Sequence, residues 1–274
     1  MPSILTSKGS SQNQRKSAMI RLDTRQIVTR LKTLESVALI SRVASTNLIA
    51  RRVLHECIEN ELLLPKAIII AGEQFAGRGR NQRSWSSPAG KGIYATTLIT
   101  RPLGELPVVP LAIANILATF VRDAFGVDAR IKWPNDILVG GKKLAGILIE
   151  ARVQEDRALL LIGTGINVEP VQNDDRTNAV SLSEVSPRDI GGLDAVTDAF
   201  ISAMDQGLSQ PFEASSVLEQ WRSLAVHRVG DSITCVIGDR TIHGTWNGID
   251  DQGRAIVQDG NESTAVSAGD LILT

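Results

Sequence analysis

Apolar residues recur at helical spacing, every three to four positions, in four stretches of the chain. This pattern predicts helices over 46–63, 108–125, 191–209 and 212–225. Each stretch has the length of an ordinary globular helix and carries polar residues on its other side. We therefore expect each helix to bury one face against a sheet.

Short runs rich in Ile, Val and Thr lie between these helices and have the pattern of buried strands. The expected strands are 66–74 with the loop that follows, 93–100, 129–139 with a break at Pro134, 142–153 and 158–168. Strands and helices do not alternate regularly, and a Gly-Gly pair at 140–141 is typical of a hairpin turn. The order predicts an α+β fold with a mixed, largely antiparallel sheet and helices on one face.

The pattern changes near residues 226–229, where short alternating strands begin, with Gly, Asp and Asn turns about every eight residues. The first residues are rich in Ser, Gln, Lys and Arg and predict disorder. We therefore expect a disordered polar tail at 1–25, a main domain at 26–227 and a small β-barrel at 228–274.

The chain has 274 residues, a formal net charge of −1, and 43% hydrophobic residues. This balance is typical of folded proteins and argues against a general nucleic-acid binder. No run approaches about 18 continuous apolar residues, and a signal-peptide pattern is missing, so we expect a cytoplasmic protein without a membrane segment. Cys57 and Cys235 are far apart, which argues against a disulfide framework and a cysteine-based zinc site.

The segment 77–85 combines three arginines, two glycines and Trp85 directly after a predicted buried strand. Glycine lets the backbone approach a ligand closely, and arginine presents forked donors that fit carboxylate and phosphate groups. The tryptophan offers a flat face to a base or an apolar ring. Two interpretations stay open here: a solvated basic loop, or a loop that binds a nucleotide, a phosphate or RNA.

Three further segments place polar residues at the ends of predicted strands: Lys132–Asp136, Lys142–Leu148 and Gly163–Val168. The Asn and Asp oxygens of the first suit Mg²⁺ or ribose hydroxyls, although a Pro-Asn-Asp turn explains them as well. The chain has neither a GxxxxGK[ST] phosphate loop nor a GxSxG nucleophile turn, and its three histidines lack metal-ligand spacing. Alone, each segment is a weak signal.

Taken together, these segments resemble the biotin protein ligases in order and spacing, over about residues 40–274. The segments that carry the resemblance are Ser45-Thr46-Asn47, GRGR at 77–80, Ser87-Pro88 with Gly92 and Tyr94, KWPND at 132–136, KLAGIL at 143–148, GTGINV at 163–168 and VSLSE at 180–184. The resemblance implies a mixed β-sheet backed by helices, like that of class II aminoacyl-tRNA synthetases, and a C-terminal SH3-like β-barrel. The main domain would then be the catalytic, biotin- and ATP-binding domain.

Members of this family use Mg-ATP to convert biotin into biotinyl-5′-adenylate. They then transfer biotin to one lysine of a biotin carboxyl carrier protein of a biotin-dependent carboxylase. The resemblance therefore implies ATP and Mg²⁺ as cofactors, biotin as substrate and this carrier protein as partner. Because a carboxylate and a phosphate repel each other, such a site must supply positive charge.

The resemblance also carries individual residues over. The expected catalytic residues are Lys143, Arg78, Arg80 and Asp136. The expected biotin-binding residues are Ser45, Thr46, Asn47, Gln74, Gly77, Arg78, Gly79, Arg80 and Lys143. The expected ATP-binding residues are Arg78, Arg80, Arg83, Trp85, Lys132, Asn135 and Asn167. Asp136 is also a candidate metal ligand and a candidate base for the acceptor lysine.

Two departures from the family pattern change the expectation. Gln82 stands where the family loop often has glycine, so the local backbone is expected to differ. The segment before Ser45 is too short for the DNA-binding winged helix that some members carry. We therefore expect a ligase without specific DNA binding, either a monomer or a weak homodimer.

Two other functions fit parts of the sequence. A lipoate or octanoate ligase or transferase would share the fold, although an ATP-independent transferase does not need an arginine-rich adenylate loop. An RNA-binding module would use the GRGR loop and the barrel as its surfaces. An aromatic content of 4% and a net charge of −1 argue against that second alternative.

Overall fold

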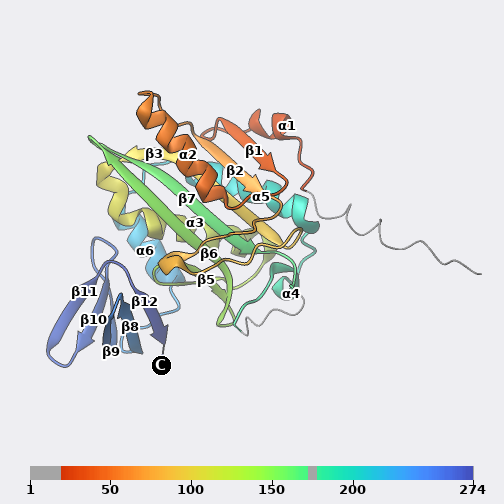
Figure 1. Cartoon of the computed structure of the whole chain (residues 1–274). Coiled ribbons are helices and arrows are strands. Elements are labelled where there is room, and N and C mark those ends of the chain that lie inside the picture. Colours follow the sequence, from red (N-terminus) through yellow and green to blue (C-terminus); the bar gives the residue numbers. More distant parts are fainter. Residues whose placement is uncertain (1–19, 172–177, 274) are drawn as a thin grey trace, which may run out of the picture.

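Two β-sheets, one of seven strands and one of five, organise the computed structural model, which describes residues 20–171 and 178–273 (Figure 1). The larger sheet has the order β1-β2-β3-β7-β6-β5-β4, in which β1 and β2 are parallel and all other neighbours are antiparallel. Its strands are β1 (Ser36–Ile40), β2 (Ala67–Ala71), β3 (Gly92–Pro102), β4 (Arg130–Lys132), β5 (Asp136–Val139), β6 (Lys142–Gln154) and β7 (Arg157–Asn167). The predicted mixed, largely antiparallel sheet is confirmed.

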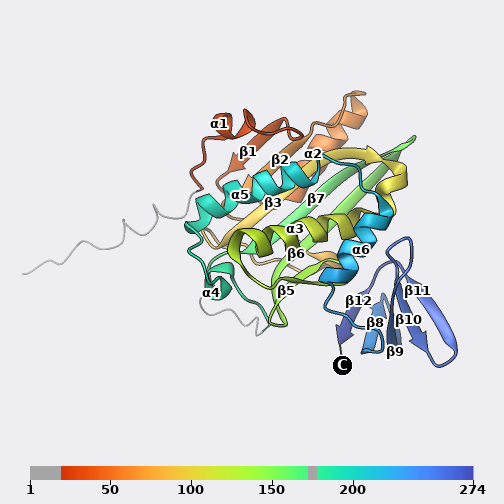
Figure 2. The ribbon, with the colours of Figure 1, turned by 180° about the vertical axis from the view of Figure 1, so that it is seen from behind.

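Helices cover both faces of this sheet, as the two opposite views show (Figures 1 and 2). The helices are α1 (Thr24–Val28), α2 (Thr46–Glu59), α3 (Val109–Phe125), α4 (Leu182–Val185), α5 (Gly192–Gly207) and α6 (Ala214–Leu224). α3, α5 and α6 lie on one face, and α2 lies on the other.

The expectation that all helices lie on one face was therefore wrong, and the central strands explain why. In β2, Ile68 and Ile70 belong to the large core beneath α3, whereas Ile69 belongs to a second cluster with Ala50 of α2. Successive side chains of a strand point to opposite faces, so an unbroken apolar run makes both faces apolar. Such a strand needs a helix on each side.

α3 is the central helix of the larger core. It ends at Gly126, which takes the left-handed conformation with φ of 69° that caps many helices. The helical segment Leu103–Phe125 is long and apolar enough to cross a membrane by length and composition, yet 61% of its most apolar window is buried inside the fold. Packing between the sheet, α5 and α6 accounts for that composition.

Residues 20–25, which were expected to belong to the disordered tail, are part of the described fold. Ile20 is buried, and the backbone N–H of Arg21 donates to the Asp194 carboxylate at 3.0 Å. The Asp23 side chain accepts bonds from the first N–H groups of α1 and so caps that helix. The expected disorder is thus wrong for 20–25, while 1–19 lies outside the described residues.

The smaller sheet is antiparallel, with the order β11-β10-β9-β8-β12. Its strands are β8 (Ser232–Ile237), β9 (Arg240–Ile249), β10 (Ala255–Asp259), β11 (Glu262–Val266) and β12 (Asp270–Leu273). The sheet lies beside α6 and next to β5, at one end of the larger sheet (Figure 1).

Trp133 joins the two sheets, and its side chain is 2% exposed. Its indole N–H donates to the Gly253 carbonyl at 3.1 Å, and its backbone N–H donates to His227 Nε2 at 3.0 Å. The His227 ring stacks on Trp246 with 4.6 Å between centroids. An imidazole that accepts this backbone bond must be neutral at Nε2.

Burial, with a smaller contribution from Lys132, lowers the pKa of His227 from 6.5 to about 4, and Asp231 opposes the shift only weakly. His227 is therefore protonated below about pH 6.5 in the unfolded chain, but only below about pH 4 in the folded chain. We expect the free energy of unfolding to fall across this window and the His227→Gln variant to show a smaller fall. Urea titrations between pH 7 and 4 measure both, and equal pH slopes for the two proteins would contradict the expectation.

Candidate functional site

A cavity of about 150 Å³ lies where α2 begins, between the loop after β2 and the strands β6 and β7. Twelve of the residues expected at the site line it: Ser45, Thr46, Asn47, Gln74, Arg78, Gly79, Arg80, Arg83, Trp85, Asn135, Asp136 and Lys143. The site expected from the sequence thus converges on one place in the fold. We call it the site cavity.

The polar end of the site cavity is held by a fixed set of hydrogen bonds around the start of α2. The backbone N–H of Thr46 donates to Gln74 Oε1 at 2.8 Å, and Gln74 Nε2 donates to Ser87 Oγ at 2.9 Å. Thr96 Oγ1 lies 2.8 Å from Thr46 Oγ1 and 2.7 Å from Asn47 Oδ1. Together with the positive end of the α2 dipole, these polar groups suit a polar, uncharged or anionic head group.

The arginine-rich loop is folded back on itself like a short hairpin. The Gly79 N–H donates to the Arg83 carbonyl at 2.8 Å, and the Trp85 N–H donates to the Gly77 carbonyl at 2.9 Å. A Cβ on Gly77 would lie 2.4 Å from the Trp85 carbonyl oxygen, so only glycine fits there. Gly77 therefore allows the close backbone packing of the loop, and it does not itself line the site cavity.

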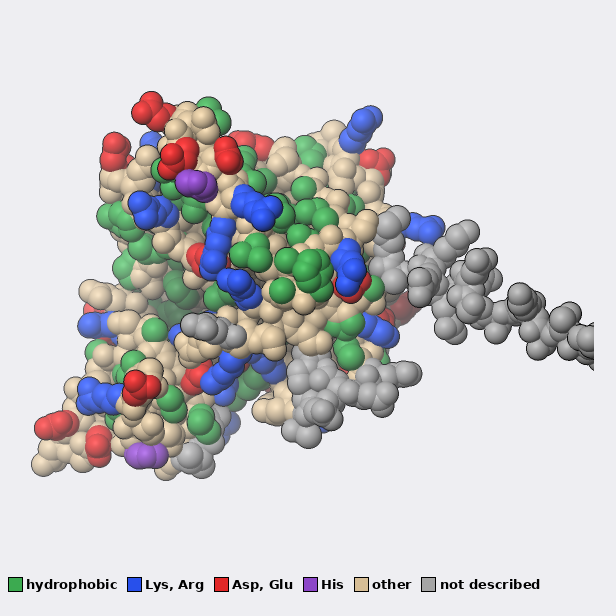
Figure 3. All heavy atoms as spheres, viewed as in Figure 1, with side chains coloured by type: hydrophobic (Ala, Val, Ile, Leu, Met, Phe, Trp, Pro, Cys, Tyr) green, Lys and Arg blue, Asp and Glu red, His purple; other side chains and the backbone are tan. Residues whose placement is uncertain are grey.

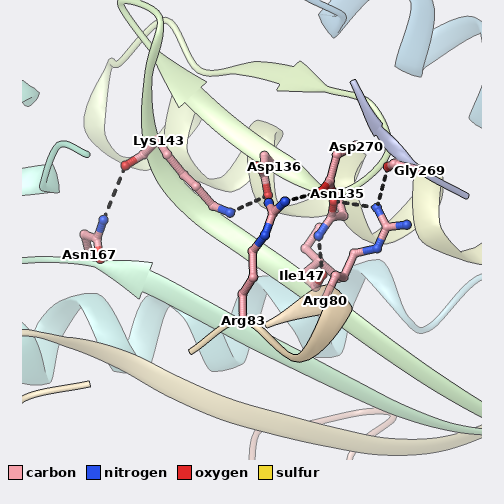
Figure 4. A network of polar contacts seen from close by, with 9 residues as sticks. All are labelled: Arg80, Arg83, Asn135, Asp136, Lys143, Ile147, Asn167, Gly269 and Asp270. Atoms are coloured by element: carbon pink, nitrogen blue, oxygen red, sulfur yellow. Dashed lines mark hydrogen bonds and ion pairs between the residues drawn. The ribbon is translucent and has the colours of Figure 1, made fainter. Parts of the chain in front are cut away.

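The cationic groups of the site come from separate parts of the chain, and each reaches a polar or acidic partner beside Asn135, Asp136 and Asp270 (Figure 4). Arg80 donates to Asn135 Oδ1 at 3.1 Å and to the Gly269 carbonyl at 3.3 Å. Arg83 forms an ion pair with Asp270. Lys143 Nζ lies 2.7 Å from Asp136 Oδ1, as an ion pair.

Positive charge exceeds negative charge around the site cavity. Four Lys or Arg side chains and two carboxylates line it, which leaves two positive charges unbalanced. Burial lowers the pKa of Arg80, whereas the carboxylates of Asp270 and Asp136 oppose that shift. Within the described ranges, the exposed Arg78 guanidinium makes neither an ion pair nor a side-chain hydrogen bond. The cavity is therefore electrostatically suited to an anionic ligand.

Figure 3 gives the wider charge distribution on the face shown. Lys and Arg side chains cross its middle, near the junction of the two sheets, and Asp and Glu side chains gather mainly at its top and lower left. The two signs are interspersed, so this face lacks the broad basic surface that a nucleic-acid binder uses.

Trp85 lies across a floor of glycines. A Cβ on Gly165 would lie 2.4 Å from Trp85 Cε2, and one on Gly146 would lie 3.0 Å from Cζ3. Lys143 Nζ is 5.3 Å from the ring centroid, a cation–π distance. The Trp85 Nε1 is buried and lacks a partner in the described structure. Gly146 and Gly165 thus leave the space that the indole occupies, whereas Gly163 leaves space for the Asn47 side chain.

Two expected ATP-binding residues do not line the site cavity. Lys132 lies on β4, outside the lining. Asn167 donates through Nδ2 to the carbonyls of Lys143 and Val180 and lines a separate cavity of about 200 Å³. Asn167 thus fixes the backbone of Lys143 by a hydrogen bond and does not itself reach the site cavity.

The sequence interpretation missed several lining residues: Ser84, Ala95, Gly146, Ile147, Leu148, Gly163, Thr164, Gly165 and Asp270. Most of them lie within the sequence segments named above, so the sequence could have predicted that they line the site cavity. Asp270 is an exception, because it belongs to β12 of the smaller sheet and its neighbours carry no pattern that suggests a site.

A second cavity of about 360 Å³ adjoins the first between the two sheets. Arg80, Asn135, Ile147 and Leu148 line both. Ligand sites for small molecules usually measure roughly 300–1,000 Å³. The site cavity alone is smaller than that range, so a sizeable ligand requires either the second cavity or a displacement of the loop that carries Trp85.

Comparison with known proteins decides the family. A profile described as "Biotin/lipoate A/B protein ligase family" matches residues 39–167, and one described as "Biotin protein ligase C terminal domain" matches residues 230–273. A biotin--[acetyl-CoA-carboxylase] ligase of Paracoccus denitrificans is 33% identical over 211 residues, with 70% of this chain and 84% of that protein covered. The chain belongs to the biotin protein ligase family.

Other members of the biotin protein ligase family extend this comparison. The bifunctional ligase/repressor BirA of Bacillus subtilis is 31% identical over 216 residues, covering 75% of this chain. The chain spans only 66% of that relative's length. The crystal structure of biotin protein ligase from Aquifex aeolicus has a TM-score of 0.66 at 18% identity and covers 88% of this chain and 100% of that chain. The fold is therefore that of the biotin protein ligases.

The glycine floor gives a direct test of the site geometry. Gly165→Ala places a methyl group inside the Trp85 indole, so we expect an altered tryptophan emission and a loss of stability of about 1–3 kcal/mol from overpacking. Gly104→Ala is the matched control, since nothing lies within 4 Å of its added Cβ. In a Trp85→Phe background, the emission change should vanish and the stability loss should shrink.

Proposed function

We propose that this protein activates biotin with ATP to biotinyl-5′-adenylate and transfers the biotin to a lysine of a biotin carboxyl carrier protein. The observation that carries the proposal is the convergence of Arg78, Arg80 and Lys143 on one positively charged cavity. Family membership supports it, and a biotin protein ligase from Aquifex aeolicus has been solved in complex with biotin and ATP.

In the first step, a biotin carboxylate oxygen attacks the α-phosphorus of ATP. A new P–O bond forms, the bond to the β-phosphate oxygen breaks, and pyrophosphate leaves with its electron pair. Two anions must approach each other, and Lys143 with Arg80 supplies the opposite charge. Arg78, which lacks a partner among the described residues, is available to a phosphate without breaking an existing ion pair.

In the second step, the acceptor lysine amine attacks the carbonyl carbon of the mixed anhydride, and AMP leaves. The amine must be neutral to attack and loses a proton as the amide forms. Asp136, 2.7 Å from Lys143 Nζ, is the candidate group that takes this proton. The anhydride is already activated, so a protein nucleophile is not required, and positioning and charge stabilisation carry the catalysis.

Mg²⁺ belongs to the proposal as the ion that accompanies ATP. It usually keeps several waters and takes one or two protein carboxylates together with substrate phosphates. Asp136 and Asp270 both line the site cavity and fit that modest role. The described residues hold no group of three or more His, Cys, Asp or Glu side chains, so a site made by the protein alone does not fit. When bound, the ion would neutralise phosphate charge.

The finer assignments of the fold and its setting are part of the same proposal. We assign the larger sheet with its helices to the architecture of class II aminoacyl-tRNA synthetases, and 228–274 to an SH3-like barrel, which the five antiparallel strands support. A boundary near 227 between the two domains, a cytoplasmic location, and a monomer or weak homodimer without specific DNA binding stay predictions from the sequence.

Intact-protein mass spectrometry tests the function directly. A biotin carboxyl carrier domain incubated with the protein, Mg-ATP and biotin should gain the mass of one biotin, and pyrophosphate should appear. Parallel reactions with lipoate and octanoate test the alternative acyl ligase of the same fold. Modification by lipoate or octanoate but not by biotin would overturn the proposal in favour of that alternative.

Lys143 should be the most damaging single loss, because its ammonium faces the reacting oxygens. We expect Lys143→Met to slow adenylate formation by about 10²–10³-fold, the cost of removing one preorganised charge donor. Lys142→Met is the matched control, since Lys142 is the exposed neighbour at the start of β6. Equal rates of pyrophosphate release for the two variants would contradict the assignment.

Asp136→Asn separates the two steps of the reaction. The variant keeps the size of the side chain and an amide oxygen that can still accept from Lys143, and it removes the basicity. We therefore expect adenylate formation to stay close to normal and transfer to the carrier lysine to slow by about a hundredfold. Single-turnover assays that start from biotin and ATP, and from preformed adenylate, measure each step. Unchanged transfer would remove Asp136 as the base.

A further inference from the structure

The contact between the two sheets reaches the site through a single short turn. Trp133 is held by two acceptors outside the larger sheet: the Gly253 carbonyl for its indole N–H and His227 Nε2 for its backbone N–H. Asn135 and Asp136, which follow after Pro134, both line the site cavity. The position of Trp133 therefore limits where these two side chains lie.

The neighbours of His227 fix its ring in the orientation that accepts the Trp133 N–H. Its ring is 7% exposed and stacks on Trp246, with an interplanar angle of 29°. Trp246 in turn lies 6.3 Å from Trp221 of α6, so the stack is anchored in the core. Just before His227, the Val226 N–H donates to the Ile131 carbonyl at 2.9 Å. Packing and backbone pairing thus fix both the ring plane and the segment that carries it.

The other end of the turn is bound tightly to the reacting groups. Asn135 Nδ2 donates to the Ile147 carbonyl at 2.7 Å, and the Ile147 N–H donates to the Asn135 carbonyl at 3.0 Å. Asn135 Oδ1 accepts from Arg80, and Asp136 pairs with Lys143. A shift of the turn would therefore displace the partners of both cations that serve adenylate formation.

We propose that His227 is a positioning residue for adenylate formation, which sets the turn 133–136 so that Asn135 holds Arg80 and Asp136 holds Lys143. The inference rests on the proposed function and extends it to a residue outside the site cavity. Without the His227 acceptor, the buried Trp133 N–H lacks a partner and recovers one only if the backbone moves.

Three variants separate positioning from simple stability. His227→Phe keeps a stacking ring and removes the acceptor, while His227→Gln removes the ring and keeps an acceptor oxygen. His243→Phe is the control, since His243 lies on β9 of the smaller sheet, exposed and bonded only to Thr234 among the described groups. If His227→Phe does not fold, His227→Met replaces it, because methionine adapts to irregular cores and offers only a weak acceptor.

Single-turnover adenylate formation is measured per folded protein, and biotin affinity is measured by calorimetry. For His227→Phe we expect a rate about ten- to a hundredfold lower, as for a catalytic group displaced by about 1 Å. Its biotin affinity should fall much less than its rate, by at most a few-fold, because Thr46 and Gln74 at the polar end of the site cavity are held independently of this turn. His227→Gln should recover a large part of the rate, and His243→Phe should match the unmodified protein.

Hydrogen exchange at the backbone amides of Trp133, Asn135 and Asp136 gives a readout that does not depend on activity. These amides should exchange faster in His227→Phe than in His243→Phe. A His227→Phe rate equal to that of the unmodified protein, or a parallel loss of biotin affinity, would overturn the positioning role alone. An unmodified protein that forms no adenylate would instead overturn the proposed function, and the catalytic part of this inference with it.

Discussion

Mutual repulsion among cations is the constraint on which this site depends. Arg80, Arg83 and Lys143 lie around one small cavity, and like charges at such distances destabilise the folded chain unless carboxylates are interleaved with them. Asp136 and Asp270 provide that balance while leaving an excess of positive charge. The interleaved carboxylates thus stabilise the cluster of cations and still leave a net positive charge in the site cavity.

The contacts that balance these positive charges also connect the two sheets. Asp270 and the Gly269 carbonyl belong to the smaller sheet, yet they contact the loop that follows β2 of the larger one. The Trp133 indole N–H also donates a hydrogen bond to the Gly253 carbonyl, which precedes β10 of the smaller sheet. The smaller sheet therefore contributes acceptors to the site. Contacts from α6 to β9, through Trp221 with Trp246 and through Arg222 with the Ile249 carbonyl, help to place that sheet.

Much of this arrangement could be predicted from the sequence, because local patterns report local structure. The helix over Val109–Phe125 and the strands β3, β6 and β7 follow from their periodicity, and the site segments from their glycines and charges. The position of α2 on the second face required the knowledge that β2 and β7 are apolar on both sides. Asp270 could not be predicted, since its role comes from tertiary packing across nearly two hundred residues of separation from Arg83.

That separation has a consequence for how the protein is made. During synthesis the chain emerges from its first residue onward, and domains tend to fold as units in that order. The larger sheet can close as soon as β7 and the later helices have emerged, but the guanidinium of Arg83 has no counter-ion until residue 270 has left the ribosome. A nascent chain is therefore expected to pass through a stage in which the larger sheet is folded but Arg83 still lacks the Asp270 carboxylate, until the last strand docks.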